Sequence, residues 1–206
     1  MSIRPIVTLG DPVLRLRGAP VTRFDRALGQ LLDDMLETMR AAPGVGLAAQ
    51  QIGLALQVCV IEVEDQVHEL INPRIVRLSG DQTDLEGCLS LPGYWAERTR
   101  AATATVEAQN RHGRPIRLTG SGLLARAIQH ELGHLEGQLY IDELAPDASL
   151  ISNAELDAMI EARKADGEGV RDHPAAADGD GGGADLRAAV ASGTESGRTE
   201  AIPSQP

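Results

Sequence analysis

Apolar side chains recur at helical spacing in one stretch of the chain, and a cap residue predicts a second helix farther along. Between Phe24 and Met39, leucine and methionine occupy positions 28, 31, 32, 35, 36 and 39, which lie on one side of a helix. Asp25 is suited to the N-cap of this helix, and Pro43 with Gly44 ends it. Ser121 is suited to cap a second helix that runs through the stretch QHELGHLEGQ, residues 129–138. A short third helix is expected at residues 153–164.

Runs of β-branched and apolar residues between these stretches predict strands. Leu56–Val63 reads as one strand, and Leu70–Leu78 as another in which Pro73 forces an edge position or a break. Ala102–Ala108, a turn at residues 111–115 and a strand at 116–118 predict a hairpin. We therefore expect an α+β fold, with short antiparallel strands surrounding the helix of residues 129–138.

The composition of the chain changes near Asp166. Residues 1–165 read as one globular domain, whereas residues 166–206 are rich in Gly, Ala and Asp and contain few large apolar side chains. Such a segment buries too little apolar area to offset the entropy of ordering. We expect a disordered acidic tail, and the alternative is a tail that binds a partner.

Charge and cysteine content narrow the function classes. The formal net charge is -11, of which the tail contributes eight acidic and three basic side chains. This balance argues against a nucleic-acid partner held by general electrostatics. Cys59 reads as a small buried hydrophobe within a strand, and the two cysteines suggest no disulfide framework. No apolar run is long enough for a membrane span and no signal-peptide core is visible, so we expect a bacterial cytoplasmic protein.

The stretch His130-Glu131-Leu132-Gly133-His134 has the H-E-x-x-H pattern of metal-dependent hydrolases. Residues i and i+4 project from the same side of a helix, so the two histidines can share one metal ion. Glu131 is then placed to reach a water on that metal rather than the metal itself. The alternative is a surface or core helix that happens to contain these letters.

Two histidines do not complete a metal site, and three sources of a third ligand were compared. A metzincin site needs a third histidine where this chain has Tyr140. A thermolysin-like site needs a downstream glutamate, but Glu143 is too near and Glu155 lies close to the end of the domain. The remaining strong candidate is Cys88, in the stretch LEGCLSLPG. One thiolate with two imidazoles leaves a fourth position for water, as in catalytic sites.

Three motifs in order resemble the peptide deformylase family. They are GVGLAAQQ at residues 44–51, EGCLS at residues 86–90 and HELGH at residues 130–134. The stretch GDPVLR at residues 10–15 and Pro20-Val21 are also similar to that family, so the resemblance covers about residues 4–145. Counted from the double alanine, the family's glutamine falls on Gln51 rather than Gln50.

The chain departs from the family's pattern at one position. The family usually has Asp before the second histidine, and here that residue is Gly133. The resemblance implies that this Asp is a supporting residue paired with an arginine such as Arg98 or Arg100. Glycine within a helix costs about 1 kcal/mol relative to alanine, which puts the rigidity of the helix and the aim of His134 in question.

The resemblance implies an enzyme that removes the formyl group from the N-terminal formylmethionine of nascent peptides and releases formate. Glu131 would move the proton, and the Gln51 amide with the Leu89 backbone N–H would stabilise the oxyanion. Ligand chemistry alone favours zinc at Cys88, His130 and His134. The resemblance implies Fe2+ as the native ion, with Zn2+, Ni2+ or Co2+ able to take its place, and it suggests the ribosome near its exit tunnel as a partner.

Candidate substrate contacts follow from the glycine-rich stretch and from the resemblance. Gly44, Val45 and Gly46, with Gly87, are expected to lie beside an extended peptide that binds as an added strand. Three further matches give an apolar pocket for the methionine side chain, namely Val45, Leu123 and Ala127. Ordinary core packing is the alternative role for these three residues.

Two other functions were compared with this one. A metalloprotease of the H-E-x-x-H class would cleave internal peptide bonds, and the missing third ligand argues against it. A non-catalytic metal-binding or ribosome-associated paralogue would keep the fold, and only Gly133 and the acidic tail favour it. Intact Gln51, Cys88 and Glu131 argue against that paralogue, because a binding protein needs no general base.

Overall fold

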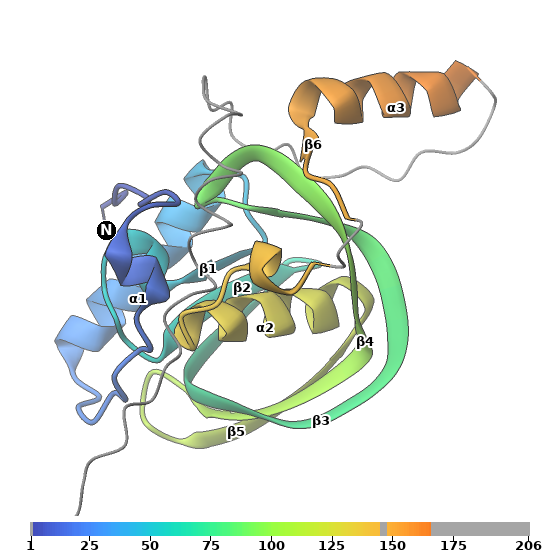
Figure 1. The fold of residues 1–206 in the computed structure, drawn as a ribbon. Coiled ribbons are helices and arrows are strands. Elements are labelled where there is room, and N and C mark those ends of the chain that lie inside the picture. The colour runs from blue at the N-terminus through green and yellow to red at the C-terminus, as the bar shows by residue number, and fades with distance from the viewer. Residues whose placement is uncertain (1, 145–147, 166–206) are drawn as a thin grey trace, which may run out of the picture.

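A computed structural model describes residues 2–144 and 148–165 of the chain, as three α-helices and one antiparallel sheet (Figure 1). In chain order the elements are α1 (Arg26–Ala41), β1 (Gly46–Ala48), β2 (Val58–Val63), β3 (Gln66–Cys88), β4 (Leu91–Gln109), β5 (Pro115–Ser121), α2 (Gly122–Leu135), β6 (Ile151–Ser152) and α3 (Asn153–Ala165). Short 3-10 helices span Pro12–Arg15, Ala49–Ile52 and Tyr140–Glu143. The predicted α+β class, with antiparallel strands around the motif helix, is confirmed.

The sheet has the strand order β1-β2-β3-β4-β5, and β6 adds to β4. Strands β3 and β4 form one long ribbon that curls around α2 (Figure 1). The predicted strand at residues 70–78 was therefore too short, because β3 continues to Cys88. Pro73 lies where the pairing register shifts between Ile71 and Arg74, so the expected break is a bulge inside the strand. A proline lacks the N–H that regular pairing requires.

Helix α1 covers one side of β1 and β2. Its N-cap is Asp25, as predicted, and the Asp25 side chain accepts hydrogen bonds from the backbone N–H groups of Ala27 and Leu28. The predicted apolar stripe is confirmed, and its buried members pack against Leu47, Val58 and Val60; they are Leu28, Leu31, Leu32, Met35 and Met39.

Helix α2 lies inside the curl of the ribbon and forms the second core. Its small and aliphatic side chains pack against strand residues that include Cys59, Ile61 and Val106. Cys59 is fully buried, as predicted, and burial raises the pKa of its thiol. Ser121 stands at the predicted N-cap position of α2, but its side chain makes no capping hydrogen bond.

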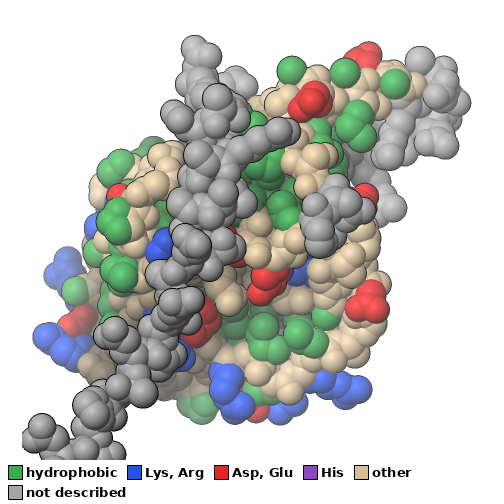
Figure 2. Space-filling view, in the orientation of Figure 1, with side chains coloured by type: hydrophobic (Ala, Val, Ile, Leu, Met, Phe, Trp, Pro, Cys, Tyr) green, Lys and Arg blue, Asp and Glu red, His purple; other side chains and the backbone are tan. Residues whose placement is uncertain are grey.

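The predicted third helix is confirmed as α3, which follows β6 directly. Strand β6 pairs with Tyr94 and Trp95 of β4, and the Trp95 indole N–H donates to the Asn153 side-chain oxygen at 2.9 Å. The predicted tail of residues 166–206 lies outside the described residues. Within the described part, no helix combines the length and apolar character needed to cross a membrane. Where side chains are visible in Figure 2, both signs of charge are interspersed.

Candidate active site

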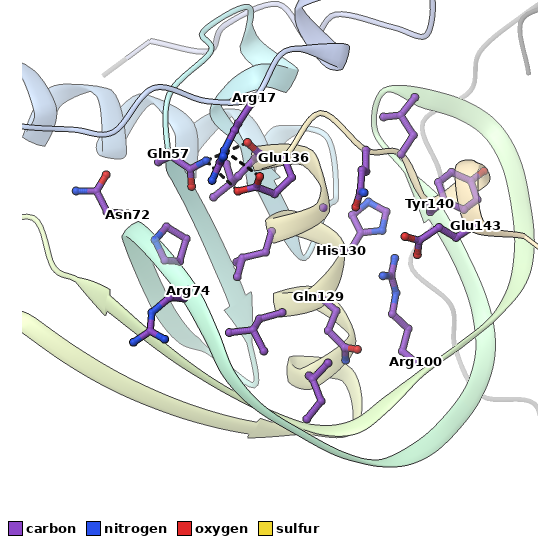
Figure 3. A pocket seen from close by; sticks show the side chains of 18 of the residues that line it. Arg17, Gln57, Asn72, Arg74, Arg100, Gln129, His130, Glu136, Tyr140 and Glu143 are labelled. Carbon is purple, nitrogen blue, oxygen red and sulfur yellow. Dashed lines mark hydrogen bonds and ion pairs between the residues drawn. The ribbon is translucent and has the colours of Figure 1, made fainter. Parts of the chain in front are cut away.

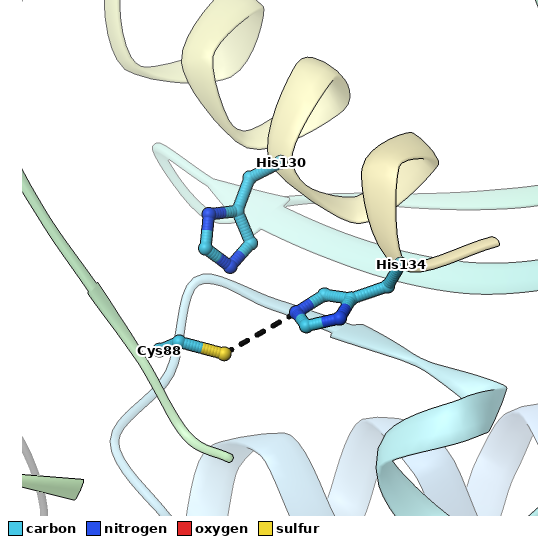
Figure 4. A group of neighbouring side chains, drawn as sticks. All are labelled: Cys88, His130 and His134. Carbon is cyan, nitrogen blue, oxygen red and sulfur yellow. Dashed lines mark hydrogen bonds between the residues drawn. The ribbon is translucent and has the colours of Figure 1, made fainter. Parts of the chain in front are cut away.

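Three potential metal ligands converge between α2 and the turn that joins β3 to β4. The donor atoms of Cys88, His130 and His134 all lie within 4.8 Å of one another (Figure 4). Cys88 Sγ is 3.2 Å from His134 Nε2, and the centres of the two histidine rings are 5.0 Å apart. Helix α2 supplies both histidines from one side, and β3 delivers the cysteine at its last residue. The sequence-predicted set is therefore assembled in space.

Glu131 lies beside this set, and its exposed fraction is 3%. Burial raises the pKa of its carboxyl to about 7, although the positive charges of His130 and Arg100 oppose that rise. Its Oε2 atom has no hydrogen-bond partner among the described residues. A Cβ atom at Gly46 would lie 2.3 Å from Glu131 Oε1, so the missing side chain at position 46 leaves the room that this carboxyl group occupies.

Gln51, and not Gln50, faces the three ligands. The Gln51 side-chain oxygen accepts a hydrogen bond from the Ala48 backbone N–H at 2.8 Å, which directs its NH2 group toward Cys88 Sγ at 3.5 Å. The Gln50 side chain instead points toward the Leu16 carbonyl oxygen. Because one end of the Gln51 amide is fixed by the backbone, its donor end is oriented before any ligand arrives.

Leu89 follows Cys88 in the tight turn between β3 and β4. Its backbone N–H is therefore next to the thiol in the chain. Its side chain packs on Gly44, where a Cβ atom would meet Leu89 Cδ1 at 2.8 Å. The turn thus brings the EGCLS and GVGLAAQQ motifs into contact, although about 40 residues separate them.

Comparison with known proteins identifies the family. A family model described as polypeptide deformylase matches residues 3–149 of the chain. The chain belongs to the peptide deformylase family. The peptide deformylase of Heliobacterium modesticaldum is 49% identical over 147 residues, which cover 71% of this chain and 97% of that protein. The peptide deformylase of Acidothermus cellulolyticus is 50% identical over 147 residues, covering 71% of this chain and 82% of that protein.

Solved structures of deformylases share the fold. A peptide deformylase from Legionella pneumophila superposes with a TM-score of 0.68 at 41% identity and covers 81% of this chain and 95% of that chain. The enzyme from Synechococcus elongatus, solved in complex with actinonin, has a TM-score of 0.67 at 39% identity, covering 82% and 91%. These matches confirm the predicted resemblance and the prediction of an enzyme.

The donor set of this family member fits a divalent metal. A thiol and two imidazoles, soft and intermediate ligands, meet at a buried point and belong to the ligand types of zinc and ferrous iron. Burial lowers the pKa of His130, but its contacts with Cys88 and Glu86 outweigh that effect and raise it to about 10. The surroundings of His130 therefore favour a positive charge, which a metal ion would supply.

Sequence reasoning did not single out Glu86, which supports His130. Glu86 accepts two hydrogen bonds from Arg100, at 2.7 and 2.8 Å, and one from Arg126 at 2.9 Å. Its other contact is His130 Nδ1, at 3.2 Å. Burial raises the pKa of Glu86, but the bonds from Arg100 and His130 hold it well below its usual range. Side chains two apart on a strand point the same way, so the spacing of Glu86 and Cys88 was the available signal.

The departure at Gly133 has a structural consequence. The two arginines suggested as partners of the family's Asp have other carboxylates here: Arg100 binds Glu86, and Arg98 binds Glu143. A Cβ atom at Gly133 would meet only the Gln138 carbonyl oxygen, at 3.9 Å. Gly133 therefore leaves open space rather than relieving a clash.

That space belongs to a cavity of about 610 Å³ along α2. Its lining includes the ion pair of Arg17 with Glu136, at 3.0 Å, and in Figure 3 Arg74 lies on one side of it and Tyr140 on the other. Gly133 is among the lining residues. A side chain added at position 133 would therefore extend into the cavity.

The candidate substrate residues divide into two groups. Gly44, Val45 and Gly46 lie at or beside β1, the edge strand of the sheet, and Gly87 lies near the end of β3 with the Trp95 ring packed against it.

The three candidates for the methionine pocket differ in exposure. Ala127 is 4% exposed and Val45 half-buried, and both pack in the α2 core, whereas Leu123 is 48% exposed. Core packing thus accounts for Ala127 but not for Leu123.

Proposed function

We propose that this chain removes the formyl group from the N-terminal formylmethionine of nascent peptides and releases formate. The observation that carries the proposal is the convergence of Cys88, His130 and His134 beside the buried Glu131, in a member of the peptide deformylase family. A nascent-peptide substrate supports our further proposal of a bacterial cytoplasmic location, with the ribosome near its exit tunnel as a partner. The ribosome as a binding partner remains a prediction.

Cys88, His130 and His134 would hold one divalent metal ion. When bound, that ion supplies a water acidic enough to be deprotonated near neutral pH and a Lewis acid for the formyl oxygen. We infer Fe2+ as the native ion, with Zn2+, Ni2+ or Co2+ able to replace it at the same donors. Cys59 is not one of the donors that converge there, and it packs instead in the α2 core.

Glu131 would act as the general base and then as the general acid. It takes a proton as water oxygen adds to the formyl carbon, and it delivers that proton to the amide nitrogen as the C–N bond breaks. Formate and a free amino terminus are then the products. A carboxyl group with a pKa near 7 can both accept and donate a proton at physiological pH, which supports this double role.

Gln51 and Leu89 would stabilise the negative charge that develops on the formyl oxygen. The Gln51 NH2 group is aimed toward Cys88 by the hydrogen bond that holds the other end of its amide. The Leu89 backbone N–H adjoins the same cysteine. Preoriented donors of this kind are each worth about 2.7–4 kcal/mol in the transition state.

The peptide would bind as an added strand at the open edge of β1. Backbone groups of residues 44–46 would pair with the peptide, which explains tolerance of many sequences after the first residue. Gly87 would border the peptide from the end of β3. The exposed side chain of Leu123, with Val45 and Ala127, would offer apolar surface to the methionine side chain.

Formate release from formyl-Met-Ala-Ser tests the proposal. The protein is purified without oxygen and loaded with iron or nickel, and wild type is compared with Glu131→Ala. We expect release by the wild type and a large loss in the variant with its metal still bound. Cys88→Ala should lose the metal, and Cys59→Ala is the matched control that should keep it. A folded, metal-loaded wild type that releases no formate would refute the proposal.

A further inference from the structure

Tyr140 lies against one of the proposed metal ligands. Its ring is stacked on that of His130, with the ring centres 6.0 Å apart and the planes inclined by 27°. Tyr140 is 3% exposed and begins the 3-10 helix Tyr140–Glu143, five residues after α2 ends. Aromatic rings at this separation attract each other beyond the effect of burial.

A turn at Gly137 brings Tyr140 back to His130. Gly137 has a φ of +78°, and a Cβ atom there would lie 2.6 Å from the Arg15 carbonyl oxygen. Glycine therefore allows the sharp turn after α2 that sends the chain back along the helix. Three residues later, Tyr140 reaches the ring of His130.

Tyr140 is held both at its side chain and at its backbone. Its hydroxyl group donates to the Tyr94 carbonyl oxygen of β4 at 3.1 Å. Its backbone carbonyl oxygen accepts from Arg98 Nη1 at 2.5 Å. The guanidinium of Arg98 is in turn paired with Glu143 at the end of the same 3-10 helix. Tyr140 is therefore anchored to β4 independently of its contact with His130.

His130 needs such a contact because its hydrogen bond to Glu86 does not fully fix the orientation of the imidazole ring. The bond between His130 Nδ1 and Glu86 fixes the direction in which that nitrogen points. That single bond, 3.2 Å long, still allows the imidazole to turn to some extent about its Cβ–Cγ bond. A second ring stacked beside the imidazole limits that rotation and so helps to fix the plane in which the other nitrogen faces a metal.

We propose that Tyr140 is a positioning residue that fixes the ring plane of His130 and thereby tightens metal binding by the Cys88–His130–His134 set. This inference rests on the proposed metal site. The stacked ring sets the plane, and Glu86 sets the direction within the plane. Partners outside the ligand shell typically change metal affinity about 10- to 100-fold when they are removed.

The test uses the full chain with Tyr140→Leu, Tyr140→Phe and Ile141→Ala. Ile141 is also 3% exposed and packs in the same cluster as Tyr140, so it is the matched structural control. The dissociation constant for Zn2+ is measured by competition with a chromogenic chelator, and the absorption spectrum of bound Co2+ reports the ligand geometry. Tyr140→Met removes the ring but leaves a flexible side chain that adapts to an irregular gap, and it replaces Tyr140→Leu if that variant does not fold.

Tyr140→Leu should raise the Zn2+ dissociation constant about 10-fold or more and shift the Co2+ bands. Tyr140→Phe keeps the stacked ring and should restore both, and Ile141→Ala should lower stability with neither change. Equal Zn2+ affinity in Tyr140→Leu and wild type would overturn the inference, as would an equal loss in Ile141→Ala. A wild type that binds no metal would overturn the proposed site and this inference together.

Discussion

Replacing Gly46 with alanine tests whether the Glu131 carboxyl group must stay where this structure places it. The added Cβ atom would lie 2.3 Å from Glu131 Oε1 and 2.8 Å from Cδ. Gly46 is not among the glycines with positive φ, so its backbone accepts alanine. Strand β1 cannot readily retreat, because Gly46 is paired with Ile61 of β2. The carboxyl group of Glu131 must therefore move.

The size of the effect follows from the overlap. An ordinary contact begins at 3.4 Å, so Glu131 Oε1 has to shift by roughly 1 Å, and a misplacement of that size costs about 100-fold in rate. A 100-fold loss corresponds to about 2.7 kcal/mol of transition-state stabilisation. Because the new methyl group points at Glu131, we expect the loss in kcat, with KM nearly unchanged.

Formate release is measured at equal metal content for four proteins: wild type, Gly46→Ala, Glu131→Ala and the double variant. If the methyl group acts through Glu131, Gly46→Ala causes no further loss once Glu131 is alanine. Gly29→Ala is the matched control, because its Cβ atom would meet nothing within 4 Å. Wild-type kcat in Gly46→Ala would refute the reasoning, and so would an additional loss in the double variant.

Three further predictions concern stability. Gly133→Ala should raise the free energy of unfolding, measured by urea denaturation, by up to about 1 kcal/mol. A decrease would mean that α2 requires glycine at this position. Hydrogen bonds from Arg4 and Gln30 lower the pKa of Asp34 to about 2, so its stabilisation is complete above its ordinary pKa and disappears as the pH falls from about 4 to 2. Asp34→Asn should flatten acid unfolding there, and an unchanged profile would contradict this. Arg126→Met should lower the free energy of unfolding by about 3 kcal/mol, because it breaks the buried pair with Glu86. The same change at the exposed Arg117 should lower it by at most about 0.5 kcal/mol. Equal losses in the two variants would be inconsistent with the burial of Arg126.

The helices could be predicted from the sequence, whereas the full ribbon could not. Helical spacing located α1, because that helix buries one side against the sheet. The cap candidate Ser121 and the H-E-x-x-H pattern located α2. The middle of β3, residues 79–84, is polar and contains glycine, so its letters indicate a loop. It forms a strand because residues 98–103 of β4 pair with its backbone, and such distant pairing leaves no local pattern.

Some residues of the candidate site could likewise be predicted from the sequence, and others could not. Cys88, His130 and Glu131 could be chosen from the sequence, because metal ligands and a general base belong to few residue types. The roles of Glu86 and Tyr140 could not, although the spacing of Glu86 and Cys88 places both on one side of a strand. Their contacts with His130 depend on how the ribbon curls and how the chain turns at Gly137. The residues that hold a ligand in place are visible only once the fold is known.

The two histidines are supported unequally, which gives Gly133 its importance. His130 has Glu86 at Nδ1 and Tyr140 on its face, whereas His134 Nδ1 is buried with no hydrogen-bond partner among the described residues. The direction of His134 thus depends mainly on the backbone of α2, and the residue just before it is glycine. Gly133→Ala should therefore slow the release of bound Zn2+ to excess chelator as well as stabilise the helix. An unchanged release rate in a stabilised variant would show that packing alone already fixes His134.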